Sequence, residues 1–239
     1  AVARLADGFD GPAFISVRPP GHHALPNRAM GFCLFNNVAI TAAGLIHEGN
    51  RVAIVDWDVH HGNGTQDIFY EEPSVLYVSI HQSPFYPYQG NPTELGAGAG
   101  VGTTLNVPLP AFTAGDVYLE AFEDLAMTAV ANYRPDWVLV SSGFDAHAHD
   151  PLAEFRLTEA DYSHMATLLT DVVAANRIVA FLEGGYHLPA LRDSSSAVIR
   201  SLLGLGNDLE PSPFRSPEIS SRALERVRGA VSGYVPGVA

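Results

Sequence analysis

The sequence predicts an α/β protein in which helices cover both faces of a central, mostly parallel sheet. Five short apolar runs rich in β-branched residues alternate along the chain with longer helical patterns. The runs lack polar alternation, as expected of strands that are covered on both faces. Because strands that alternate with helices build parallel sheets, we expect a three-layer α/β/α architecture.

Each predicted strand is one of the apolar runs, and each predicted helix lies between two of them or after the last. The strands are expected at residues 13–17, 52–57, 75–80, 137–141 and 178–182. The helices are expected at residues 34–48, 62–70, 114–132, 158–175 and 189–203. Thr158 and Asp161 resemble a capping box at the start of the fourth helix. A last, weak helix is expected after the Pro- and Ser-rich stretch that begins at Pro211.

One long connection between the elements is predicted to be functional. Residues 82–102 are rich in Gly and Pro and include Phe85, Tyr86 and Tyr88. Loops of this length are uncommon in compact domains, and those that occur usually bind ligands or border active sites.

The size and composition of the chain favour one soluble domain over residues 1–239. Of its 239 residues, 47% are hydrophobic and 16% are charged, which is typical of a well-packed globular protein. The net charge is −13, from 13 basic and 26 acidic residues, and argues against nucleic acid as a partner. The acidity suits either a cationic substrate or ordinary solubility.

The cellular compartment is predicted from the cysteine content and from the absence of targeting patterns. The single cysteine, Cys33, excludes an internal disulfide and fits a reducing cytoplasm. No apolar run is long enough to span a bilayer, so no membrane partner is expected. The chain begins without Met and without a signal-peptide pattern, so its start is a processing site, a cloning boundary or a truncation. We therefore expect a cytoplasmic protein.

The segment that ends the second predicted strand indicates a metal site. Asp56, Asp58 and His60 occupy alternate positions there, and side chains two apart on a strand share a face. Two carboxylates and an imidazole that face one way repel and desolvate one another unless a cation lies among them. A divalent metal is the simplest solution.

Polar segments follow the other four strands in the same way. Because the carboxyl ends of parallel strands lie at one edge of a sheet, we expect these segments to converge on one site. Taken alone, an Asp at a strand end, a His pair or a Gly-Gly turn is more often structural than catalytic. Their occurrence on successive strand ends favours function. The segments are Arg18-Pro19-Pro20-Gly21-His22-His23, Ser79-Ile80-His81, Ser142-Gly143-Phe144-Asp145-Ala146-His147 and Glu183-Gly184-Gly185-Tyr186-His187.

In this order, the motifs resemble those of the zinc-dependent histone deacetylase family, which includes bacterial acetylpolyamine amidohydrolases. The resemblance covers about residues 13–205 and leaves residues 206–239 as a C-terminal extension. It implies an arginase/deacetylase-like fold, and Asn63 and Glu183 are similar to the class II branch. A binuclear hydrolase of the arginase type would need more metal ligands than can be placed.

The resemblance implies a role for each motif residue. Asp58, His60 and Asp145 would bind zinc and leave one coordination position open for water and substrate. His22 and His23 would flank the reacting water. Asp56 would orient His22, Asn63 would orient His23, and the Tyr186 hydroxyl would meet the substrate carbonyl. An Asp partner stabilises an imidazolium and an Asn partner does not, so we expect His22 to be the more basic histidine.

The resemblance also implies a substrate tunnel and structural monovalent cations. The tunnel would be lined by Gly31, Phe32, Phe85 or Tyr86, and Gly184. One potassium or sodium ion would be bound by backbone oxygens in the metal-binding loop, and a second would lie nearby. The residues expected at the first site are Asp56, Asp58, His60, Ser79 and Ile80, and those at the second are Phe69, Glu72 and Val75.

These features predict a metal-dependent hydrolase that removes acyl groups from a small acylated substrate or an acetyl-lysine peptide. Zinc lowers the pKa of a bound water and polarises a carbonyl, while a histidine transfers the proton. A site with two carboxylates and one imidazole also suits Fe(II) or Co(II). Two alternatives stay open: an esterase for small acyl esters, and a catalytically impaired module that binds acyl-lysine.

The chain departs from the family pattern at its N-terminal side. Family domains usually carry about a hundred more residues before the first motif-bearing strand, and these supply a sheet edge and a loop over the tunnel. An uncovered edge or apolar rim favours association, so we expect a homo-oligomer. His81, His147 and His187 are expected near the site in roles other than metal binding, and Cys33 in tunnel-wall packing.

Overall fold

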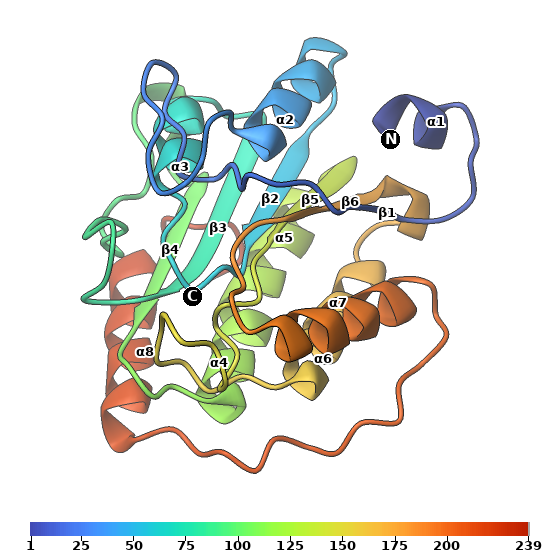
Figure 1. Cartoon of the computed structure of the whole chain (residues 1–239). Coiled ribbons are helices and arrows are strands. Elements are labelled where there is room, and N and C mark those ends of the chain that lie inside the picture. Colours follow the sequence, from blue (N-terminus) through green and yellow to red (C-terminus); the bar gives the residue numbers. More distant parts are fainter. Residues whose placement is uncertain (239) are drawn as a thin grey trace.

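The computed structural model describes residues 1–238 and contains one six-stranded sheet, in which all paired strands are parallel (Figure 1). The order of the strands across the sheet is β1-β6-β5-β2-β3-β4. The strands are β1 (Ala13–Ile15), β2 (Val52–Asp56), β3 (Val75–Gln82), β4 (Thr104–Leu109), β5 (Trp137–Ser142) and β6 (Ile178–Leu182). The predicted three-layer α/β/α architecture is confirmed.

The five predicted strands are present, and the sixth, β4, was not predicted. Strand β4 contains Pro108 and lies at an edge of the sheet, where it pairs only with β3. A proline cannot donate a hydrogen bond to a neighbouring strand and is therefore tolerated mainly in edge strands. The predicted first strand is shorter than expected, because pairing with β6 ends at Ile15.

The helices occupy the connections between the strands. The predicted helix over residues 114–132 is one continuous rod whose middle turns are π-helical. The short helix at the N-terminal end was not predicted. None of the helices described for residues 1–238 is long and apolar enough to cross a membrane. The helical elements are α1 (Val2–Ala6), α2 (Asn37–His47), α3 (Asn63–Phe69), η1 (Gly98–Gly100), α4 (Gly115–Ala121), η2 (Phe122–Met127), α5 (Thr128–Tyr133), α6 (Glu159–Thr170), η3 (Ala175–Arg177), α7 (Leu188–Leu202) and α8 (Glu218–Val231).

Each face of the sheet carries its own hydrophobic core, because successive strand residues point to opposite faces. Val52 and Ile54 of β2 pack with α1, α2 and α3 on one face. Ala53 and Val55 pack with helices α4 to α8 on the other face. By this alternation Asp56, the last residue of β2, points to the side of α2 and α3.

The strand register brings the predicted motifs to one edge. Asp56 is opposite Ser79 of β3 on one side and Ser141 of β5 on the other. Ser142 is opposite Leu182 of β6. The polar segments after β2, β5 and β6 therefore begin at nearly the same level of the sheet, whereas Ser79, Ile80 and His81 lie within β3, which continues to Gln82.

Candidate metal centre and active site

Three predicted metal ligands meet just beyond the carboxyl ends of β2 and β5. The ligand atoms of Asp58, His60 and Asp145 all lie within 4.8 Å of one another. His60 Nδ1 is 3.0 Å from Asp58 Oδ1 and 3.2 Å from Asp145 Oδ2. Both carboxylates are buried, and the imidazole is only slightly exposed.

Backbone amides hold the two carboxylates in place. The Gly184 amide donates to Asp58 Oδ2 at 2.8 Å, and the Val59 amide donates to Asp145 Oδ1 at 2.9 Å. Because one oxygen of each group is fixed in this way, the other oxygen faces the common centre. Asp145 Oδ2 is buried there and, among residues 1–238, has no hydrogen-bond partner of acceptable geometry, although His60 Nδ1 is 3.2 Å away.

The charges of this cluster suit a divalent cation. Burial and the neighbouring Asp58 raise the pKa of Asp145 to about 6. Burial lowers the pKa of His60, but the close carboxylates of Asp145 and Asp58 outweigh burial and raise this pKa to about 10. Both pKa shifts arise because the carboxylates of Asp58 and Asp145 lie together and have only the His60 imidazolium between them as a positive charge. An ion in place of the imidazolium proton would bind both carboxylates and leave His60 neutral, which is the form that binds metals.

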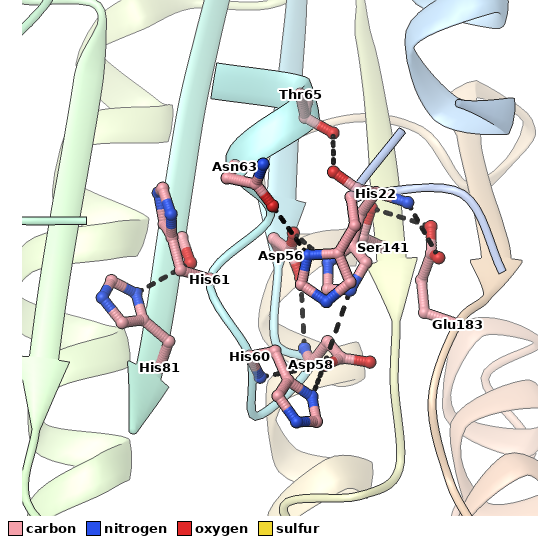
Figure 2. A network of polar contacts seen from close by, with 12 residues as sticks. His22, Asp56, Asp58, His60, His61, Asn63, Thr65, His81, Ser141 and Glu183 are labelled. Carbon is pink, nitrogen blue, oxygen red and sulfur yellow. Dashed lines mark hydrogen bonds and ion pairs between the residues drawn. The ribbon is translucent and has the colours of Figure 1, made fainter. Parts of the chain in front are cut away.

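The two histidines of the first motif lie beside this cluster, each with its own partner. Figure 2 shows His22 beside Asp56. His22 Nδ1 is 3.0 Å from Asp56 Oδ2, and His23 Nδ1 is 2.8 Å from Asn63 Oδ1. Their ring centroids are 4.1 Å apart. Because a carbonyl oxygen only accepts hydrogen bonds, Asn63 fixes the tautomer of His23 with the proton on Nδ1, leaving Nε2 as the base.

The two histidines differ in charge in the direction expected from the sequence. Burial lowers the pKa of His22, but Asp56 and Asp58 overcome it, so the pKa lies well above its ordinary value. Burial, followed by repulsion from His22, lowers the pKa of His23 to about 2. The pKa of His23 is therefore low mainly because the ring is buried and lies beside the positively charged His22, and less because its partner Asn63 is neutral.

Tyr186 and the predicted tunnel residues surround a narrow cavity of about 60 Å³ above the ligands. Of the two candidates for the facing wall, Tyr86 lines the cavity and Phe85 does not. Phe85 instead stacks on His60 with ring centroids 5.1 Å apart. Phe32 is 74% exposed at the mouth, and its ring centroid is 6.4 Å from that of Tyr186. The lining residues are Pro20, His22, His23, Gly31, Phe32, Asp58, His60, Tyr86, Asp145, Leu152, Gly184 and Tyr186.

Two glycines are required by close approach. A Cβ on Gly31, whose φ is +55°, would collide with the His23 ring. A Cβ on Gly184 would collide with Asp145 Oδ2 and lie 2.7 Å from Asp58 Oδ2. The His23 ring is therefore packed directly against the backbone of Gly31, and the two carboxylates are packed directly against the backbone of Gly184.

The residues expected at the two monovalent-cation sites fall in different places. Asp56 ends β2 next to the metal loop and is opposite Ser79, which is followed by Ile80 within β3. Phe69 is the last residue of α3, and Val75 begins β3 at the opposite end of that strand. The third member of the second group, Glu72, accepts a hydrogen bond from the Ser74 amide.

The neighbouring histidines have structural contacts. His187 caps α7 by accepting a hydrogen bond from the Ala190 amide. His147 Nε2 is 3.2 Å from Glu159 Oε1. His81 contacts Ser79 Oγ and the Gly90 carbonyl, and so ties β3 to the long loop.

Two residues support the paired histidines in ways that the sequence did not predict: Tyr77 was not expected at the site, and Glu183 was expected there without an assigned contact. The Tyr77 hydroxyl donates to Asp56 Oδ2 at 3.1 Å, and Glu183 Oε2 accepts from the Gly21 and His22 amides. The alternation along β2 and β3 was a usable signal for Tyr77, which is opposite Ile54 and shares the face of Asp56. The partners of Glu183 in the histidine segment are backbone amides, which leave no pattern in a sequence.

The sequence and the structure were compared with known proteins. The family model of the histone deacetylase domain matches residues 1–202. Over 238 residues the chain is 42% identical to histone deacetylase 14, chloroplastic, of Arabidopsis thaliana, covering 96% of this chain and 56% of that protein. Over 211 residues it is 41% identical to a probable deacetylase of Archaeoglobus fulgidus, covering 86% of this chain and 58% of that protein.

A solved structure gives the same result for the fold. The crystal structure of the HDA15 HD domain matches with a TM-score of 0.90 and 37% sequence identity, and covers 99% of this chain and 66% of that one. The chain thus spans little more than half the length of the two curated relatives.

Proposed function

Because the chain belongs to the histone deacetylase family, we propose that it is a metal-dependent hydrolase that removes acyl groups from amides such as acetyl-lysine or acetylpolyamine. The observation that carries the proposal is the convergence of three ligand atoms, two buried histidines and a tyrosine on one narrow cavity. These residues come from segments far apart in the sequence.

The metal would be held by Asp58, His60 and Asp145. The unpartnered Oδ2 of Asp145 and the mixed oxygen and nitrogen donors fit a zinc ion, and they also fit Fe(II) or Co(II). When bound, such an ion supplies Lewis acidity, which polarises the substrate carbonyl and lowers the pKa of water.

The histidine pair would handle the protons of amide hydrolysis. The attacking water must lose a proton, and the leaving amine must gain one. His23 is neutral and keeps Nε2 unprotonated, so it would take the proton of the water and return it to the leaving amine. His22, held as a cation by Asp56, would stabilise the negative charge that develops beside it.

Tyr186 would donate its hydroxyl hydrogen to the carbonyl oxygen of the substrate. Its amide is fixed by Asp150 Oδ2 at 2.7 Å, and its ring lies 5.9 Å from the Arg18 guanidinium carbon. Burial, followed by the nearby charges of Asp145 and Asp58, raises the pKa of the phenol above its ordinary value. The hydroxyl therefore stays protonated at neutral pH and remains a donor.

A structural monovalent cation, potassium or sodium, forms part of the proposal. The pairing of Asp56, at the end of β2, with Ser79 of β3, beside Ile80, supports the first of the two expected sites. For the second site, near Phe69 and Val75, the support is the resemblance alone.

The proposed function is tested by removing and restoring the metal. Chelation should abolish hydrolysis of acetyl-lysine amide, and Zn²⁺, Fe²⁺ or Co²⁺ should restore it to the same protein sample. Comparing kcat/KM for acetylpolyamine, an amide, with kcat/KM for nitrophenyl acetate, an ester, would show which class of substrate the protein hydrolyses better. Tight binding of an acyl-lysine peptide to the metal-loaded protein without turnover would contradict the proposal and favour a binding module.

A further inference from the structure

Glu183 is a fully buried carboxylate that contacts the catalytic segment without lining the cavity. It follows β6 directly, and its side chain is 0% exposed. Glu183 Oε2 accepts hydrogen bonds from the Gly21 amide at 2.6 Å and the His22 amide at 3.1 Å. Glu183 Oε1 accepts from Ser141 Oγ at 3.3 Å. Figure 2 shows this carboxylate beside the backbone of His22.

We propose that Glu183 is a positioning residue that sets the location of the His22–His23 pair relative to the metal ligands and Tyr186. The inference rests on the proposed function, since it assigns a role within the same site. Glu183 would act through the backbone of His22 and would not touch the substrate.

The backbone of His22 is held at both its amide and its carbonyl, so its position is fixed. Glu183 binds the amide, while the Gly64 and Thr65 amides at the start of α3 donate to the His22 carbonyl at 3.1 and 3.2 Å. Asp56 then fixes the ring through Nδ1. With amide, carbonyl and ring all held, the ring has little freedom to move toward or away from the centre.

The segment that carries Glu183 also supports the other half of the site. The next residue, Gly184, donates its amide to Asp58 Oδ2, and Tyr186 follows two residues later. One short segment therefore links the histidines, a metal ligand and the hydroxyl donor. A change in the length of the Glu183 side chain would move the first of these relative to the other two.

Hydrogen bonding rather than charge is the main contribution of Glu183. No Lys or Arg is paired with it among the described residues 1–238. Burial raises the pKa of Glu183 to about 7, even though His22 lowers it. A neutral side chain of the same length can make the same contacts, because a glutamine oxygen accepts from both amides while its NH₂ donates to Ser141 Oγ.

Two substitutions separate length from charge. Glu183→Gln keeps the length and removes the charge, and Glu183→Asp keeps the charge but withdraws the carboxylate by about 1.5 Å. We expect Glu183→Gln to retain kcat within about threefold, and Glu183→Asp to lower kcat by roughly 100-fold with little change in KM. Higher kcat in Glu183→Asp than in Glu183→Gln would overturn positioning in favour of charge.

A second readout does not depend on activity. In the metal-free protein, the Nδ1 proton between His22 and Asp56 should give a downfield NMR signal that persists in Glu183→Gln and is lost or shifted in Glu183→Asp. An unchanged signal and wild-type kcat in Glu183→Asp would overturn the inference. If the wild-type protein hydrolyses no acyl substrate, the proposed function fails, while the NMR comparison still tests the position of His22.

The matched control is Asp161→Glu. Asp161 is also buried and accepts a backbone hydrogen bond, from the Thr158 amide at 2.7 Å, but it lies in the cap of α6. This change should lower the melting temperature and leave kcat unchanged. An equal fall in kcat in the control would show that the Glu183 effect is general destabilisation, which would overturn positioning.

Discussion

At the scale of single residues, the hydroxyl of Tyr186 is the most direct test of the chemistry. It contributes nothing to the metal cluster, so its removal should leave metal content unchanged. We expect Tyr186→Phe to lower kcat on acetyl-lysine amide by roughly 100-fold or more, because an oxyanion donor is worth about 3–4 kcal/mol. Steady-state kinetics on the metal-loaded protein would measure this.

The chain offers a matched control for that substitution. Tyr162 is fully buried, and its hydroxyl has no hydrogen-bond partner among the described residues. Because Tyr162→Phe removes an unsatisfied buried hydroxyl, it should leave kcat unchanged and keep or raise stability. Near-wild-type turnover in Tyr186→Phe would remove this tyrosine from the mechanism.

The residues that were predictable from the sequence are those whose partners are side chains at strand ends. Strand order brought the segments that carry Asp58, His60 and Asp145 to one edge of the sheet, and the family resemblance selected these three residues as ligands. The structure places their ligand atoms within 4.8 Å of one another. Glu183 and the facing wall of the cavity could not be placed, because backbone hydrogen bonds and loop conformation leave no residue pattern. Choosing between Phe85 and Tyr86 needed coordinates for the same reason.

At the scale of elements, the turn after β6 has no room for an added side chain at Gly184. A methyl group on Gly184 would lie against both metal-binding carboxylates. We expect Gly184→Ala to weaken zinc affinity by roughly 10- to 100-fold, the usual effect of disturbing groups that orient metal ligands. Calorimetric titration of the metal-free protein with zinc would measure the loss.

The same substitution in a helix provides the comparison. Gly44 lies inside α2 with no atom within 4 Å of an added Cβ. Gly44→Ala should raise stability by about 0.5–1 kcal/mol through helix propensity and leave zinc affinity unchanged. Wild-type zinc affinity in Gly184→Ala would show that the ligands have more room than the structure indicates.

Element prediction succeeded where periodicity was strong and failed where local chemistry opposed it. The buried strands and the helices α2, α3, α6 and α7 were found within a few residues of their ends. Strand β4 alternates Thr104 and Asn106 with apolar residues and contains Pro108, so it does not read as a buried strand. The π-helical turns of η2 keep the same apolar face as their neighbours and have no separate signal.

At the scale of the whole molecule, histidines that are buried in neutral form couple stability to pH. Burial, followed by repulsion from His61, lowers the pKa of His81 well below 6.5. Since the unfolded chain binds a proton below about pH 6.5 and the folded chain does not, the free energy of unfolding falls as the pH drops below that value. One such histidine lowers the free energy of unfolding by about 1.4 kcal/mol for each pH unit below that value.

Replacing His81 should therefore make the free energy of unfolding depend less steeply on pH in acid. In the metal-free protein, His81→Gln should reduce the slope of unfolding free energy against pH by about 1.4 kcal/mol per unit below about pH 6. Denaturant titrations at several pH values would measure it. His47→Gln, at an exposed position on α2, should leave the slope unchanged. An equal slope in His81→Gln and the wild type would contradict neutral burial.

The pairing of β1 with β6 has a consequence for the order in which the site forms. Ala13 is opposite Val179, so the strand that leads to His22 and His23 has its only neighbour near the far end of the sequence. Contacts between distant parts of a chain form late and slowly. During synthesis, His22 and His23 therefore cannot take their final positions until β6 and Glu183 have emerged from the ribosome. The proposed active site can assemble only after the whole stretch from β1 to β6 has been made.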